Sequence, residues 1–180
     1  IYLRSKLLRL PFSGKLFLHE NVRMIKDSSA DKLLRDSVLD ARGRRKDLTV
    51  LTGVEFKIAD ALRAGYDGAL GGGNIISGRL VVDMIEASRR RAWTEVDRLQ
   101  RRVDRILYTC YGGRSIRGWL ATFKYALCRM GIFSTAKGYL EFPCAAADRR
   151  AIVTMLARER EVLFPSPMPN SGTQMLRREP

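Results

Sequence analysis

The stretch that decides the fold is Val22-Arg23-Met24-Ile25-Lys26-Asp27-Ser28-Ser29. Valine, methionine and isoleucine favour a buried, extended backbone. Aspartate and serine favour the start of a helix, and apolar residues then recur at helical spacing. The pattern therefore predicts a strand over residues 22–27 and a helix over residues 29–42 that ends at Gly43, with Lys26 near the end of the strand.

A lysine at the end of a core strand allows two interpretations. Burial of a charged group is costly, so such a lysine needs a reason to be there. Desolvation lowers the pKa of a lysine, and the resulting free amine can attack a ketone to form a Schiff base. Alternatively, the side chain simply reaches solvent past the end of the strand. This stretch alone leaves both interpretations open.

The neighbouring segments repeat the alternation of strand and helix. We expect the end of a strand at residues 1–3 and a helix over residues 11–19. Further along, the pattern predicts a strand over residues 47–54 and a helix over residues 56–64 that Gly65 closes. A very short strand over residues 67–70 follows. Short connections between alternating strands and helices are typical of βαβ units, so we predict a parallel sheet.

A glycine-rich turn, Gly71-Gly72-Gly73-Asn74, follows the last predicted strand. Its backbone N–H groups can bind a carboxylate or a phosphate, because a helix follows. It is not a P-loop, since no Gly-Lys-Ser/Thr comes after it, and it does not match the dinucleotide-binding fingerprint well. A tight turn at the mouth of the sheet is the alternative interpretation.

The rest of the sequence predicts helices only, over residues 80–90, 93–110, 116–130 and 148–162. We expect the aromatic residues Trp93, Trp119 and Phe123 to belong to the core. The segment from residue 165 to residue 180 is rich in proline and serine, and we expect a flexible tail there.

Composition limits the classes of function. The net charge of +14 over 180 residues permits anionic partners, although arginines interspersed with acidic residues usually form a solvated helix face. No apolar run is long enough to span a membrane, so we expect no membrane partner. Three widely spaced cysteines, Cys110, Cys128 and Cys144, indicate reduced thiols in the core of a cytoplasmic protein. The single histidine, His19, excludes a multi-histidine metal site, and we expect no cofactor.

Three motifs in order, Ile25 to Ser29, Leu51-Thr52-Gly53 and Gly65 to Gly71, resemble the dihydrodipicolinate synthase / N-acetylneuraminate lyase family of pyruvate-dependent class I aldolases. The resemblance implies an α/β fold of the (β/α)8 TIM-barrel type, with the active site at the C-terminal ends of the strands. Residues 1–90 would be the C-terminal half of the barrel, comprising the end of strand 5 and strands 6–8. Residues 91–164 would be a C-terminal helical region.

The resemblance also assigns roles to single residues. Lys26 matches the lysine that forms the Schiff base, and Tyr2 matches the tyrosine that relays protons near the imine. Gly53 and Glu55 match positions that face the second substrate. Gly71 and Gly72 match the turn near the bound keto acid. Residues 3–6, Leu-Arg-Ser-Lys, lack the family's usual Asn-x-Pro pattern after the tyrosine.

Three hypotheses about function remain at this point. The first is a lyase or aldolase that condenses or cleaves pyruvate, or another 2-keto acid, with an aldehyde, acting as a homo-oligomer like its relatives. The second is an inactive remnant that acts by self-association, because a barrel needs eight strands and the sequence supplies the end of one strand and three more. The third is a basic helical protein that binds nucleic acid, against which stands the absence of a recognisable nucleic-acid motif. The chain begins at Ile1 rather than methionine, so we expect a processed product or a segment of something longer.

Overall fold

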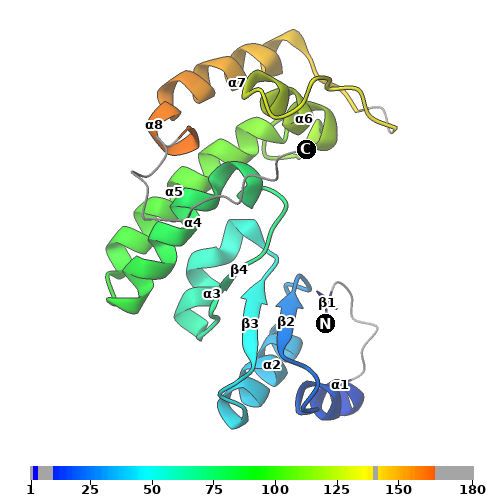
Figure 1. Ribbon diagram of the computed structural model, residues 1–180, viewed down its shortest axis with the longest axis vertical. Helices are drawn as coiled ribbons and strands as arrows, with labels where there is room; N and C mark the ends of the chain where they lie inside the picture. Colours follow the sequence, from blue (N-terminus) through cyan, green and yellow to red (C-terminus); the bar gives the residue numbers. More distant parts are fainter. Residues whose placement is uncertain (1, 4–9, 140–141, 165–180) are drawn as a thin grey trace, which may run out of the picture.

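The computed structural model describes residues 2–3, 10–139 and 142–164 (Figure 1). Its sheet has four parallel strands in the order β1-β2-β3-β4. The strands are β1 (Tyr2–Leu3), β2 (Met24–Asp27), β3 (Thr49–Thr52) and β4 (Gly68–Ala69). In the register, Lys26 pairs with Tyr2 on one side and with Leu51 on the other. The predicted parallel sheet is thus confirmed.

The first three α-helices follow β1, β2 and β3, and they are α1 (Leu10–Phe17), α2 (Lys32–Arg44) and α3 (Ile58–Ala64). These helices pack on one face of the sheet through a small apolar core. The core consists of Phe17, Ile25, Leu34, Val38, Ala41, Leu48, Val50, Ala61 and Tyr66. Side chains alternate across a strand. Ile25 and Asp27 are buried, whereas Lys26 is half-buried and Met24 is 46% exposed. Lys26 therefore belongs to the opposite face of the sheet.

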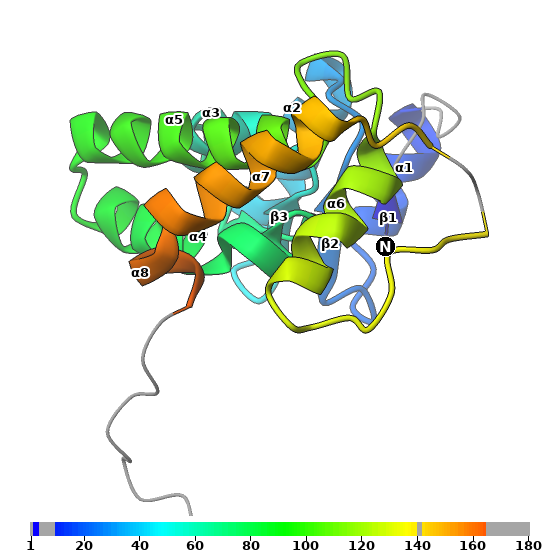
Figure 2. The same ribbon diagram turned by 90° about the horizontal axis from the view of Figure 1, so that it is seen from above.

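A second core joins α3 to the C-terminal helices, which are α4 (Asn74–Arg89), α5 (Trp93–Cys110), α6 (Trp119–Arg129), α7 (Ala146–Arg158) and α8 (Arg160–Leu163). Helices α4 and α5 run side by side, and α6, α7 and α8 gather at the end away from α1 and α2 (Figures 1 and 2). Fully buried members of this core include Leu80 and Met84 before residue 90 and Ile106 after it. One apolar core thus runs through both sides of the expected boundary at residue 90.

Several predicted boundaries differ from the observed ones. Helix α2 begins after Asp31, whose side chain accepts a hydrogen bond from the Leu34 amide, and it continues through Gly43 to Arg44. Gly65 closes α3 with φ +104°, as predicted. Helix α4 begins at Asn74, six residues earlier than expected. The predicted last helix is two helices, α7 and α8, which meet at the buried Glu159.

Other expectations concern single side chains. Trp119 is 45% exposed, so its assignment to the core was wrong, whereas Phe123 is buried. His19 is exposed, and the three cysteines form no disulfide. Cys110 is buried as expected, but Cys128 and Cys144 are only half-buried, so their assignment to the core was wrong. Within the described ranges, no helix combines the length and the hydropathy needed to cross a bilayer. The predicted flexible tail, residues 165–180, lies outside the described residues.

The second core gives a test of the fold. Ile106→Ala should lower the free energy of unfolding by about 2–5 kcal/mol, because it leaves a cavity around a side chain with no exposed surface. Ile75→Ala is the matched control, because Ile75 is 62% exposed and should cost well under half as much. Urea unfolding of both variants measures the difference, and equal losses would contradict the packing described here.

Candidate functional site

Lys26 lies at the carboxyl end of β2, beside the segment that follows β3. A Cβ atom built on Gly53 would lie 2.8 Å from Cε of Lys26 and 1.8 Å from Oγ of Ser28. Real Cβ atoms do not approach other atoms so closely, so the lack of a side chain at Gly53 leaves the space that the side chains of Lys26 and Ser28 occupy. The carboxyl ends of parallel strands are also where open α/β sheets bind ligands. The structure thus places the half-buried Lys26 at the edge of the sheet where such folds bind ligands.

The neighbouring Asp27 anchors this strand end from the other face. Its Oδ1 accepts hydrogen bonds from the Ser29 amide at 2.8 Å and from the Ser29 hydroxyl at 2.6 Å. Its Oδ2 accepts one from the Tyr66 hydroxyl at 2.6 Å. The backbone carbonyl of Asp27 accepts the Gly53 amide at 2.6 Å. One buried residue therefore fixes both the end of β2 and the start of the segment after β3.

Tyr66 stays a hydrogen-bond donor at this anchor. Burial, followed by its hydrogen bond to Asp27, raises the pKa of the Tyr66 phenol far above its ordinary value. The Asp27–Tyr66 pair also borders a cavity of about 280 Å³ between the start of α2 and α3, on the helical side of the sheet. This cavity lies on the face opposite to Lys26.

Glu55, in the short 3-10 turn η1 (Glu55–Lys57), connects the sheet to the C-terminal helices. Its Oε1 accepts a short hydrogen bond from the Gly73 amide, and its Oε2 accepts one from the Tyr111 hydroxyl at 2.9 Å. The Gln100 side chain donates to the backbone carbonyl of Glu55 at 3.0 Å and accepts from the Ala59 amide at 2.9 Å. Burial, and after it the negative charge of the neighbouring Glu55 carboxylate, raises the pKa of the Tyr111 phenol.

The glycine-rich turn after β4 receives this carboxylate. A Cβ atom on Gly71 would lie 2.3 Å from Cγ of Glu55, and one on Gly73 would lie 2.7 Å from the Tyr111 hydroxyl. By contrast, no atom lies within 4 Å of such a Cβ on Gly72. The sequence left open whether this turn binds a carboxylate or only reverses the chain. In the structure it binds one, and the carboxylate comes from the protein itself.

The structure brings together the predicted site residues in two groups. Lys26 meets Gly53, and Glu55 meets Gly71, with Gly72 open beside it. The backbone of Tyr2 pairs with that of Lys26, while the side chain of Tyr2 lies outside the described parts. Sequence analysis missed Asp27, Tyr66 and Tyr111 as members of the site. An acidic residue directly after the strand lysine was the available signal for Asp27, whereas the two tyrosines come from distant segments.

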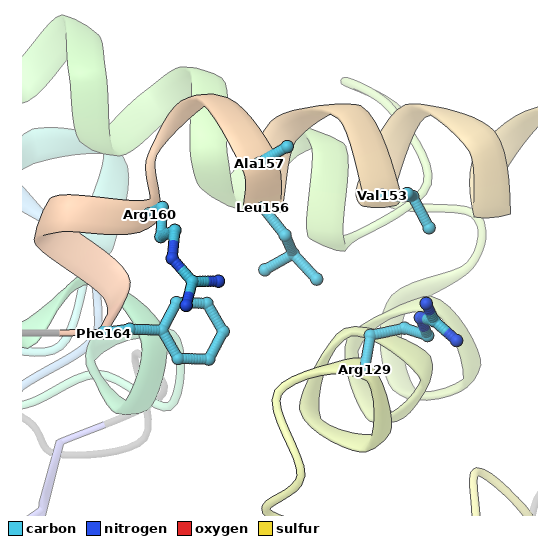
Figure 3. Close-up of a pocket in the computed structure, with 6 residues that line it drawn as sticks. All are labelled: Arg129, Val153, Leu156, Ala157, Arg160 and Phe164. Atoms are coloured by element: carbon cyan, nitrogen blue, oxygen red, sulfur yellow. The ribbon is translucent and has the colours of Figure 1, made fainter.

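Two other features are not part of this arrangement. Among the described residues, no group of three or more histidine, cysteine or acidic side chains is placed to hold a metal ion. A separate cavity of about 200 Å³ lies between α6, α7 and α8. The Arg160 guanidinium lies over the Phe164 ring there, and the Arg129 side chain extends from α6 away from both (Figure 3). Its walls, Val153, Leu156 and Ala157, offer no group for acid–base or nucleophilic chemistry.

Gly53 offers a direct test of the site geometry. Gly53→Ala should displace Ser28 and Lys26 and cost about 1–3 kcal/mol of unfolding free energy, as overpacking does. Gly72→Ala is the matched control and should cost less than 1 kcal/mol, because its Cβ meets open space. Thermal unfolding of both variants measures this, and a neutral Gly53→Ala would contradict the close approach.

The Asp27 anchor makes a separate prediction. Tyr66→Phe should lower the free energy of unfolding by about 1–3 kcal/mol, because it leaves Oδ2 of the buried Asp27 without its donor. Tyr139→Phe is the control, since the side chain of Tyr139 is fully exposed. Chemical denaturation of the two variants should separate them, and equal stability would show that the anchor does not hold the strand end.

The chain is similar in structure to solved enzymes of one kind. A dihydrodipicolinate synthase from Bacteroides thetaiotaomicron matches with a TM-score of 0.72 and 25% identity, over 87% of this chain and 54% of that one. An N-acetylneuraminate lyase from Fusobacterium nucleatum matches with a TM-score of 0.71 and 18% identity, over 88% and 53%. A dihydrodipicolinate synthase from Bacillus clausii matches with a TM-score of 0.73 and 14% identity, over 88% and 54%.

In sequence, neither a family model nor a curated protein matches the chain. The chain spans about half the length of the solved structures it matches. The resemblance that the three motifs predicted is therefore confirmed at the level of structure: the protein has the fold of about half of a dihydrodipicolinate synthase or N-acetylneuraminate lyase.

Proposed function

We propose that this protein is a Schiff-base-forming lyase or aldolase that acts on pyruvate, or another 2-keto acid, together with an aldehyde. The observation that carries the proposal is the place of Lys26, half-buried at the carboxyl end of a strand in a sheet that shares its fold with two lyase types. In this proposal, β1 is the end of the fifth barrel strand and β2, β3 and β4 are the sixth, seventh and eighth.

The proposed chemistry uses the amine of Lys26 as a nucleophile. The amine adds to the keto carbon, and loss of water gives an imine. Once protonated, the imine accepts the electron pair released when the neighbouring carbon loses a proton, which forms an enamine. The enamine carbon then bonds to the carbonyl carbon of an aldehyde, and water releases the product. Cleavage follows the same steps in reverse.

The surroundings of Lys26 support this role. The strand end is held by Asp27 and by the amide of Gly53, so the amine is presented from a fixed position. Tyr2 is the proposed proton relay, because its backbone pairs with that of Lys26 across β1 and β2. Gly53 and Glu55 are proposed to face the aldehyde, and Gly71 and Gly72 to face the keto acid.

The solved neighbours also support the choice of substrates. One neighbour is an N-acetylneuraminate lyase from Fusobacterium nucleatum solved in complex with pyruvate, with a TM-score of 0.68 and 19% identity. Another is a protein from Clostridium difficile solved with mannosamine, with a TM-score of 0.67 and 18% identity. Pyruvate is thus the first keto acid to offer to this chain.

A second candidate function is a catalytically inactive remnant that acts by self-association. Exposed apolar side chains on and beside the sheet favour it, since Met24 is 46%, Leu70 is 48% and Ile75 is 62% exposed. Large exposed apolar residues in one region mark association surfaces. The two candidates differ in whether Lys26 reacts with a keto acid.

Trapping of the imine separates the two candidates. The full chain is incubated with pyruvate and sodium borohydride, which reduces an imine to a stable secondary amine, and intact mass is then recorded. We expect one reduced pyruvate adduct on the parent chain and none on Lys26→Ala, because only the strand lysine is fixed at the reaction site.

Lys57→Ala is the matched control, since Lys57 is an exposed lysine near the same end of the sheet. It should form the adduct as the parent does. An adduct that survives in Lys26→Ala and disappears in Lys57→Ala would contradict the assignment. A folded parent chain that forms no adduct would favour the remnant.

A further inference from the structure

We propose that the exposed face of α5 binds nucleic acid through the phosphate backbone, without reading the base sequence. The contact surface is the α5 arginine stripe, which consists of Arg98, Arg101 and Arg105 and is extended by the arginines of residues 89–91 at the turn between α4 and α5. All of these side chains are exposed. None of them belongs to the site around Lys26, so the proposal is independent of the proposed lyase function.

The packing of α5 decides where its arginines point. Residues 89–105 contain seven arginines and only three acidic residues, so this segment carries a surplus of positive charge. The three arginines of the α5 arginine stripe follow one another at spacings of three and four residues, which places them on one face of the helix. The opposite face belongs to the second core, where Val96 and Val103 have no exposed surface. Burial of the apolar face therefore turns the α5 arginine stripe towards solvent.

The acidic side chains of α5 are each engaged by another side chain of the protein. The pairs are Glu95 with Arg98 at 2.6 Å, Asp97 with Arg63 at 2.7 Å, and Asp104 with Gln100 at 2.7 Å. By contrast, neither Arg101 nor Arg105 forms a salt bridge within the described ranges of the chain. The usual reason for arginines on a solvated helix face, pairing with acidic neighbours, thus does not account for these two.

The helix dipole does not account for them either. Cations stabilise the C-terminal turn of a helix, which is reason enough for Arg89 in the last turn of α4. Arg101 and Arg105 lie in the middle of α5, whose last turn contains no basic residue. An anion bound from outside the chain gives these two guanidinium groups a role.

The form of the α5 arginine stripe selects the class of partner. The stripe is about 10 Å long, and a nucleic-acid duplex carries one phosphate per ~1.7 Å of its axis, so several phosphates meet the row of cations at once. The guanidinium group also binds phosphate with two parallel N–H donors. A helix that lies on an anionic membrane needs exposed apolar side chains beside its cations, and α5 exposes no large apolar side chain. Contacts to phosphates carry no sequence information, so they do not require a recognisable nucleic-acid motif.

Fluorescence anisotropy with a labelled DNA duplex tests the proposal on the full chain. Arg101→Gln with Arg105→Gln should weaken binding by about 10–100-fold at about 0.1 M salt, since two phosphate contacts are lost. Lys15→Gln with Lys46→Gln is the matched control, because it removes two exposed cations that lie on α1 and after α2. The control should weaken binding by less than about threefold, because salt screens charges that do not touch the duplex.

A salt titration of the same variants counts the phosphate contacts. The slope of log affinity against log salt concentration should be shallower by about two in Arg101→Gln with Arg105→Gln, and it should stay as in the parent chain in the control. Arg101→Lys with Arg105→Lys keeps both charges and should keep the slope of the parent chain. Duplexes of unrelated sequence should bind with affinities within about threefold of one another.

Three results would overturn the proposal. One is a parent chain that does not bind the duplex, and another is equal weakening by the glutamine variant of α5 and by the lysine control. The third is a parent chain that binds vesicles of phosphatidylserine, or poly-glutamate, more tightly than it binds the duplex. Circular dichroism checks that every variant is folded, which we expect because glutamine is a good helix former at exposed positions.

Discussion

The buried carboxylate of Asp27 holds the part of the structure on which the proposed chemistry depends. Its hydrogen bonds to Ser29 and Tyr66 fix the end of β2 to the helical side of the sheet. Since successive side chains of a strand point to opposite faces, this fixes Lys26 on the other face. The Asp27 carbonyl also holds the Gly53 amide, and Gly53 leaves the space that Lys26 occupies. One residue without a role in the chemistry thus positions the residue proposed to perform it.

The carboxylate of Glu55 plays the corresponding part between the sheet and the helices. It joins the segment after β3 to the glycine-rich turn and to Tyr111 at the end of α5. In addition, Arg102 of α5 binds the buried Glu159 at 2.6 Å, where α7 ends and α8 begins. Removal of one partner from a buried charge pair is expensive, because it leaves the other charge buried and uncompensated. The Glu55 contacts thus tie the helical region to the sheet, and the Arg102–Glu159 contact ties α5 to the last two helices.

Much of the fold was predictable because local signals agreed with tertiary packing. Helix α5 has the predicted bounds, since its apolar residues recur with helical spacing over its whole length. The parallel sheet followed from the alternation of strands and helices. Local signals failed where distant residues decide the outcome. Gly43 is typical of a helix end but lies inside α2, and Glu159, where α7 ends, binds Arg102, which is 57 residues away.

The sequence predicted the central lysine of the candidate site, but it did not predict the residues that hold the surrounding backbone in place. The residue types around Lys26 predicted a lysine near the end of a strand, and the resemblance assigned roles to Lys26, Gly53 and the glycine-rich turn. The carboxylate that the turn binds comes from Glu55, and sequence spacing does not reveal that pairing. Tyr66 and Tyr111 reach Asp27 and Glu55 across 39 and 56 residues, respectively. Contacts of that separation arise only from the folded arrangement of the helices.

The most direct test of the account is a crystal structure of the chain soaked with pyruvate. The account predicts continuous electron density from Nζ of Lys26 to the keto carbon of pyruvate, with the carboxyl end of β2 held by Asp27 and Tyr66 as described. Pyruvate bound elsewhere, or absent while the Lys26 side chain is well ordered and unmodified, would contradict the claim that this lysine is the reactive group.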